Sequence, residues 1–199
     1  DVWTDEDISL GHTRLAIVDI NGSDQPILAQ SGNILIVNGE IYNHLNLRKN
    51  NAQYTWTTNG DSEAILALHE RALSTSRTKL SAKQHAKWIS QLNGMYAIAI
   101  WNPKQKQLLL ARDPMGIKPL VRTEVDGSLL FASEAKALRA HEGHIPQIDE
   151  LALIARLAWE YPLDGTTLFR GVAQVRPGTV ETWSIDDNGC ATITGKATV

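Results

Sequence analysis

The stretch ILIVNGEIYN, residues 34–43, joins four consecutive aliphatic residues directly to a dense polar cluster. Aliphatic side chains at every position of 33–37 except the first predict a strand in a sheet that is covered on both faces. The pair Asn38-Gly39 then has two interpretations. It is the favoured pair of a tight hairpin turn, or it belongs to a site built where a buried strand ends.

The rest of the chain predicts strand pairs separated by groups of helices. Strict alternation of strand and helix is absent, which disfavours a doubly wound parallel sheet. Asp61 and Asp149 are placed to cap two of the helices. The pattern therefore predicts an α+β fold, a helix/sheet/sheet/helix sandwich. We expect strands over 14–20, 95–101, 107–112, 128–133 and in the tail after 167, and helices from 61, over 82–92, over 134–140 and over 150–161.

Length, charge and composition narrow the functional classes. A chain of 199 residues suits one domain with a full core, and a net charge of −3 without a basic face argues against nucleic acid as a partner. No apolar run approaches the roughly 20 residues that span a bilayer, so no membrane partner is expected. The start, DVWTDEDISL, lacks the basic and apolar regions of a signal peptide. The single Cys190 suits a reducing compartment, and we expect a cytoplasmic protein.

Polar residues gather where the expected strands and helices begin or end. The amide of Asn38 and the backbone N–H of Gly39 can converge on one oxygen atom. Such a pair would hold the oxyanion of an acyl-transfer intermediate, where one donor contributes about 3 kcal/mol. The four clusters are GHTR (11–14), NGE (38–40), NGD (59–61) and RDPMGIKP (112–119).

Three charged residues in these clusters extend the same interpretation. Arg14 can fork onto a carboxylate, and Glu40 and Asp61 can accept hydrogen bonds from an ammonium or an amide. Each also has a simpler role: a surface ion pair for Arg14, solvation for Glu40 and a helix cap for Asp61. Taken together, one cation, two acids and a donor pair fit a free α-amino acid with a carbonyl in its side chain. The six histidines are scattered, so no metal site is predicted.

Seven blocks occur in order along the chain: LGHTRLAIVDINGSDQPI, NGEIYNHLNLR, TNGDSEAILAL, LNGMYAIAIWN, LLLARDPMGIKPL, LLFASEAKAL and TLFRGVAQVRPG. Together they resemble the glutaminase domain of glutamine-hydrolysing asparagine synthetases. This is a class II glutamine amidotransferase domain, a member of the N-terminal nucleophile hydrolases. The resemblance covers about residues 9–180 and implies one such domain over 1–199, folded as a four-layer αββα sandwich.

The resemblance implies a role for each candidate residue. Asn38 and Gly39 would form the oxyanion hole. The residues that would bind L-glutamine are Arg14 at its α-carboxylate, Leu15, Ile17 and Val18 along its pocket, and Glu40 and Asp61 at its α-ammonium and amide. The block RDPMGIKPL is assigned no chemical step, and its Arg-Asp pair is expected to be structural.

The implied activity is hydrolysis of glutamine to supply ammonia for an asparagine-synthetase-like amidation. The implied partner is a synthetase domain or an acceptor-activating protein, and a homodimer is left open. No cofactor is expected in this domain. ATP and Mg²⁺ would belong to a synthetase domain, whose SGGLDS-like loop does not occur in the 199 residues.

One departure from the family concerns the nucleophile. The family uses an N-terminal cysteine, whereas this chain starts at Asp1 and its one cysteine, Cys190, lies in the tail outside every block. Either the domain is incomplete at its N-terminus, or it has lost the nucleophile and serves as a silent structural or interaction domain. The complete glutamine-binding set favours the first interpretation. A third interpretation, another N-terminal nucleophile hydrolase, is disfavoured because Arg14 and Asp61 together suit a free amino acid. On either of the first two, the chain alone is expected not to hydrolyse glutamine.

Overall fold

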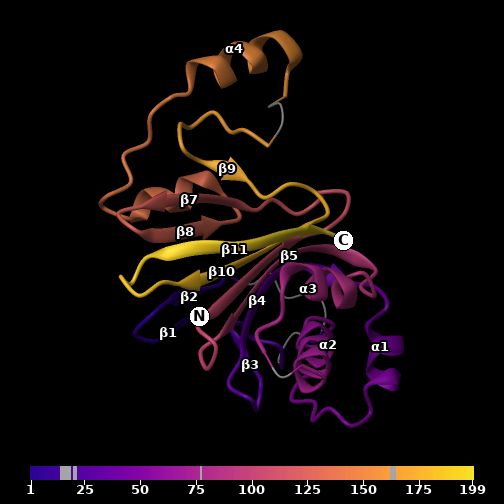
Figure 1. Cartoon of the computed structure of the whole chain (residues 1–199). Helices are drawn as coiled ribbons and strands as arrows, with labels where there is room; N and C mark the ends of the chain where they lie inside the picture. Colours follow the sequence, from indigo (N-terminus) through magenta and orange to yellow (C-terminus); the bar gives the residue numbers. More distant parts are fainter. Residues whose placement is uncertain (14–18, 20–21, 77, 162–164) are drawn as a thin grey trace.

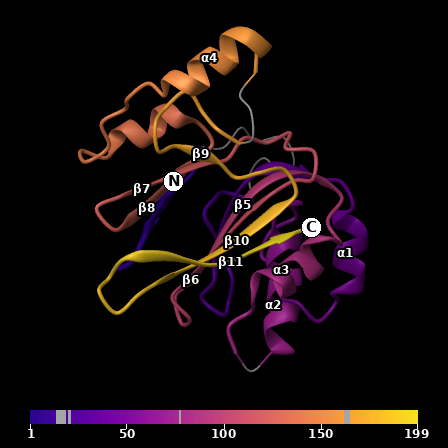
Figure 2. The same cartoon turned by 45° about the horizontal axis from the view of Figure 1, so that its top comes forward.

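Two stacked β-sheets, with helices covering the outer face of the larger one, make up the molecule (Figures 1 and 2). The structure is a computed structural model that describes residues 1–13, 19, 22–76, 78–161 and 165–199. The strand expected over 14–20 therefore lies outside the described residues, apart from Asp19. Among the described residues, no helix has the length and apolar character needed to cross a membrane.

The described strands form a large sheet, a small sheet and a separate pair, all with antiparallel neighbours. The large sheet has the order β11-β10-β6-β5-β4-β3, the small sheet β8-β7-β9, and β1 pairs with β2. The strands are β1 (Val2–Thr4), β2 (Ser9–Gly11), β3 (Ile27–Leu28), β4 (Ile34–Ile41), β5 (Gly94–Asn102), β6 (Gln107–Arg112), β7 (Val121–Val125), β8 (Ser128–Ala132), β9 (Ala173–Gln174), β10 (Thr179–Ile185) and β11 (Ala191–Thr198). The helices are α1 (His44–Asn50), α2 (Glu63–Ser74), α3 (Ala82–Ile89), α4 (Glu150–Trp159) and the 3₁₀ helix η1 (Ala135–Ala140).

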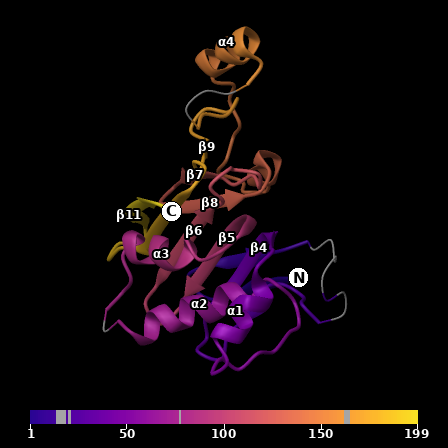
Figure 3. The same ribbon diagram turned by 90° about the vertical axis from the view of Figure 1, so that its right-hand side faces the viewer.

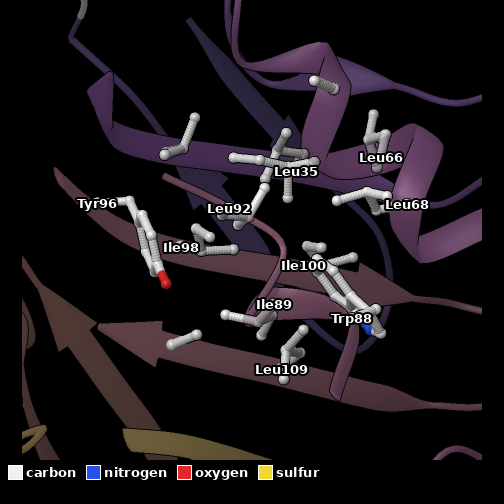
Figure 4. Packing of buried hydrophobic residues seen from close by; sticks show 14 of the residues in the cluster. Leu35, Leu66, Leu68, Trp88, Ile89, Leu92, Tyr96, Ile98, Ile100 and Leu109 are labelled. Carbon is white, nitrogen blue, oxygen red and sulfur yellow. The ribbon is translucent and has the colours of Figure 1, made fainter. Parts of the chain in front are cut away.

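The aliphatic run of β4 feeds two cores, as its pattern predicted. Leu35 and Val37 enter the core between the large sheet and helices α2 and α3, whereas Ile34 and Ile36 face the small sheet. Figure 4 shows the helix-side core, where Leu35 on β4 and Leu66 on α2 pack into the same cluster. Helix-covered on one face and sheet-covered on the other, β4 is buried on both sides.

The strand does not end at Asn38, and both interpretations of the Asn38-Gly39 pair placed the end of the strand too early. β4 runs on to Ile41, with Asn38 opposite Ala97 and Gly39 opposite Tyr96. A hairpin turn at this pair is therefore wrong. The polar residues are part of the strand itself, which fixes their directions by the alternation of a strand.

Helix ends follow the predicted caps in one case and not in another. The carboxylate of Asp149 accepts from the Ala152 N–H and caps α4, as predicted. The expected Asp61 cap is wrong: the N-cap of α2 is Ser62, without a side-chain cap, and Asp61 is used elsewhere. Helix α3 is shorter than expected and begins with a capping box between Ser81 and Gln84.

The predicted α+β sandwich is confirmed, with a thin fourth layer. On β8, Leu129 and Phe131 face the large sheet, while Leu130 faces Leu138 of η1 on the outer side. Helix α4 does not join this layer; it stands away from the rest of the molecule (Figure 3).

Candidate active site

Along the outer edge of β4, side chains form hydrogen bonds with the backbone of Val37 and of Ile41, on either side of Gly39. The N–H of Val37 donates to Gln25 Oε1 at 2.6 Å, and Gln25 Nε2 donates back to the Val37 carbonyl at 3.0 Å. Four residues on, the Ile41 N–H donates to Asp61 Oδ2 at 2.7 Å. Backbone groups two residues apart on an antiparallel strand point to the same side. The N–H of Gly39 therefore points outward between the side chains of Gln25 and Asp61.

The side chains of Asn38 and Glu40 point toward the small sheet. They share a strand face with Ile36, which packs between the sheets. Opposite Asn38 stands Ala97, a small residue, and its neighbour on that face of β5 is Ala99. These short side chains leave space above the sheet.

That space is a cavity of about 800 Å³. Its lining brings together four of the predicted site residues, Asn38, Gly39, Glu40 and Asp61. Asn38 Nδ2 lies 3.4 Å from Ser133 Oγ across the cavity mouth, and this contact orients the amide group. Other polar lining residues are His12, Thr13, Gln25, Ser62, Lys118, Glu134 and Lys136.

His12 lines the same cavity next to the strand edge. Its Nε2 lies 3.1 Å from the Val37 carbonyl, the oxygen that also accepts from Gln25. This ring therefore braces β4 on the N-terminal side of Asn38.

A buried ionic network holds the loop that carries Asp61. The carboxylate of Glu63, 1% exposed, accepts from the backbone N–H and the hydroxyl of both Thr57 and Thr58. Arg48 donates to the carbonyls of Thr58 and Gly60 and lies 3.9 Å from Glu63. Asp61 is only 7% exposed, and this network fixes its backbone so that its carboxylate reaches the end of β4.

The loop RDPMGIKP is closed by its own first two residues, which confirms that the Arg-Asp pair is structural. Arg112 donates to the carbonyls of Gly116, Lys118 and Val175. Asp113 accepts from three N–H groups of the same loop, those of Met115, Ile117 and Lys118. The loop reaches the cavity through Lys118.

Not every predicted residue can be placed. Arg14, Leu15, Ile17 and Val18 lie outside the described residues, so their roles stay predictions. Cys190 is in the turn between β10 and β11, where its side chain lies against Gly127, and it is not part of the cavity lining. Among the described residues, no group of three or more histidine, cysteine or acidic side chains could hold a metal ion.

Three residues of this site escaped prediction. Gln25, Glu63 and Ser133 act on the backbone or on another side chain rather than on a substrate. Each of the three lies inside one of the quoted blocks. Nothing in their spacing indicates that Gln25 braces β4, that Glu63 braces the loop 57–60 or that Ser133 orients Asn38.

A family model described as a glutamine amidotransferase domain matches residues 1–193. The chain belongs to this family. The amidotransferase domain is 36% identical over 177 residues to asparagine synthetase [glutamine-hydrolyzing] 1 of Bacillus subtilis, covering 87% of the chain and 26% of that protein. It is 39% identical over 135 residues to asparagine synthetase [glutamine-hydrolyzing] 3 of Arabidopsis thaliana, covering 67% and 21%.

The fold has relatives among solved structures. Glutamine phosphoribosylpyrophosphate amidotransferase from B. subtilis superposes with a TM-score of 0.62 at 21% identity, covering 94% of this chain and 34% of that one. This similarity supports the α+β sandwich fold. The amidotransferase domain spans about a quarter of the length of the curated asparagine synthetases that it matches.

Proposed function

We propose that this domain hydrolyses L-glutamine to glutamate and ammonia, and that the ammonia feeds an amidation of the asparagine synthetase type. The observation that carries the proposal is the convergence of Asn38, Gly39, Glu40 and Asp61 on one cavity. Two donors and two carboxylates match the carbonyl oxygen and the ammonium of one glutamine molecule.

The donors at β4 would stabilise the charge that develops during the reaction. When a thiolate attacks the side-chain carbonyl carbon of glutamine, the carbonyl oxygen becomes an oxyanion. Asn38 Nδ2 and the outward Gly39 N–H can both donate to it, and both are held before substrate arrives, by Ser133 and by the strand. The C–N bond then breaks, ammonia leaves with a proton from the nucleophile's α-ammonium, and water hydrolyses the thioester.

The carboxylates of Glu40 and Asp61 would hold the amino-acid end of the substrate. Asp61 uses Oδ2 for the Ile41 N–H, which leaves Oδ1 for an ammonium. Arg14, by resemblance, would bind the α-carboxylate. No metal or nucleotide is required by this set of groups, and any ATP chemistry would belong to a synthetase partner.

We further propose that the thiol comes from an N-terminal cysteine outside the 199 residues. A second cavity, about 500 Å³, lies between β2 and β8, which are each paired on one side only in the described part of the chain. Its floor includes Ile36 and Trp101 of the large sheet, and it adjoins the first cavity at Gly11, Ile36 and Phe131. An extended segment between β2 and β8 would bring its end beside Asn38.

Intact mass and N-terminal sequencing of the protein at its natural length test this proposal first, followed by an assay of glutamate release. We expect a mass above 21.9 kDa, a cysteine at the first position and glutamine hydrolysis that an alkylating agent abolishes. A protein that begins at Asp1, or one that carries the cysteine and leaves glutamine intact, contradicts the proposal.

A further inference from the structure

Helix α4 is apolar around most of its circumference and yet exposed. Leu151, Ile154 and Leu157 are 79%, 62% and 76% exposed, and Trp159 is 60% exposed. At about 100° per residue, these side chains and Leu153 spread over roughly 240° of the helix surface. Ala152 is the one buried residue of the helix. Helices that are apolar on nearly all sides are typical of a buried position.

The helix is held in place rather than trailing from the body. Two extended segments lead to and from it and bond to each other: the Asp149 N–H donates to the Leu168 carbonyl, and the Arg170 N–H to the Gln147 carbonyl. Ile148 and Phe169 form a β-bridge between these two bonds. This stalk presents α4 away from the two sheets, as Figures 1 and 3 show. An exposed apolar helix that is held in a defined position is typical of a protein-interaction site.

We propose that α4 is the docking element by which the domain is held to its synthetase partner, in a groove that encloses the helix on several sides. The inference rests on the proposed function, because it takes the user of the ammonia as the occupant. The helix carries few charged residues, Glu150 and Arg156 among its ten, which suits the core of an interface. The asparagine synthetases that match are about four times as long as the matching region, so they contain the mass needed for such a groove.

A second copy of this domain fits the helix less well. In a two-fold pair, the same stripe of each helix meets its counterpart. A stripe of one helix facing another covers much less than the exposed arc from Leu153 through Leu151 to Trp159. A multi-helix domain can cover that arc, whereas a helix pair leaves much of it in water.

Hydrogen exchange of residues 150–159 tests the proposal in the natural-length protein and in the 199-residue chain. We expect these amides to exchange at least about tenfold more slowly in the natural-length protein, because docking protects the helix. The variant Leu151→Glu/Leu157→Glu should lose this protection and form less amide product per glutamine hydrolysed. It should keep the wild-type rate of glutamine hydrolysis. The control Leu45→Glu, at a 63% exposed leucine of α1, should keep both.

Three outcomes overturn the inference or separate it from the proposed function. Equal exchange of α4 in both proteins overturns the docking. A dimer of the 199-residue chain in light scattering that Leu151→Glu/Leu157→Glu dissociates assigns the helix to a second copy and also overturns it. A protected α4 in a protein that does not hydrolyse glutamine supports the docking and contradicts the proposed function alone.

Discussion

Gly39 contributes a backbone donor to the cavity and also permits the close packing of β4 against β5. Its N–H points out of the sheet toward the cavity, and its missing side chain allows β4 and β5 to lie close together. A Cβ at Gly39 would overlap the carbonyl oxygen of Met95 and stand 2.7 Å from the Cα of Tyr96. Tyr96 turns its own backbone groups away from β4, since its N–H and carbonyl both bond to Asp113. Gly39 and Tyr96 thus form a close, non-hydrogen-bonded pair.

Gly39→Ala tests this close approach. The added methyl group meets backbone that cannot rotate aside, so we expect a loss of about 1–3 kcal/mol in the free energy of unfolding. Thermal and urea unfolding measure it. The control is Gly11→Ala, where the added Cβ would meet only Val2 at an ordinary 3.8 Å. Equal stability of the two variants would contradict the argument.

The grouping of four candidate residues could be predicted from the sequence, because polar residues follow the apolar runs at those points, whereas their chemical roles stay predictions. Asn38, Gly39, Glu40 and Asp61 all reach the cavity. What the sequence did not show was how they are held. The end of the strand was misplaced because Asn-Gly favours a turn locally, and the pairing of β4 with β5 over eight positions overrides that preference.

At the scale of elements, the loop before α2 is positioned by a buried carboxylate. Glu63 satisfies the backbone N–H groups of Thr57 and Thr58, while Arg48 holds two carbonyls of the same loop and stacks on Trp56 at 4.1 Å. Because Glu63, a residue of α2, holds the loop, the Asp61 side chain is not needed as a helix cap. Its carboxylate instead accepts a hydrogen bond from the Ile41 N–H of β4.

Glu63→Ala should release this loop. Arg48 would be left largely buried without its carboxylate, so we expect a loss of about 3 kcal/mol in stability, together with a higher KM for glutamine as Asp61 shifts. Chemical denaturation and glutamine titration of the hydrolysis rate measure the two effects. Glu142→Ala, at an exposed site, is the control and should change stability by less than about 0.5 kcal/mol. A Glu63 variant as stable as the control would refute the role of the network.

Helices α2 and α3 meet at two buried histidines. The rings of His69 and His85 stack with centroids 5.5 Å apart. Burial, with the nearby His85 as a second cause, lowers the pKa of His69 to about 3. Burial also lowers the pKa of His85 to about 4, opposed by its hydrogen bond to Gln107. Both rings are therefore neutral in the folded protein well below the pH at which an unfolded chain protonates them.

This pair predicts a stability that falls with acid. Below the unfolded pKa of about 6.5, the unfolded chain binds protons that the folded protein does not, so stability drops as pH falls from 6.5 toward 4 and then 3. Between pH 6.5 and pH 5 each histidine should lower the free energy of unfolding by about 1.5 kcal/mol. His69→Leu should lose about half of this pH dependence, and the control Leu45→Ala, at an exposed residue that does not titrate, none of it. Urea unfolding at a series of pH values gives the slopes, and identical slopes for all three proteins would contradict the assignment.

At the scale of the whole molecule, stacking of the two sheets creates the site. The outward edge of β4 matters only because the small sheet, through β8 and the start of η1, closes a cavity over it. The layer order followed from the pattern of strand pairs and helix groups. The detachment of α4 did not, since its apolar residues resemble those of a core helix. Only the structure shows that, within the described residues, α4 stands apart from the core with Ala152 as its one buried residue.

The most direct test of the central claim, an oxyanion hole on β4, is the rate of glutamate release from the natural-length protein and its Asn38→Ala variant. We predict hydrolysis by the wild type and a kcat lower by about 10²–10³ in the variant, with the fold unchanged by circular dichroism. An Asn38→Ala protein that hydrolyses glutamine at the wild-type rate would contradict the account.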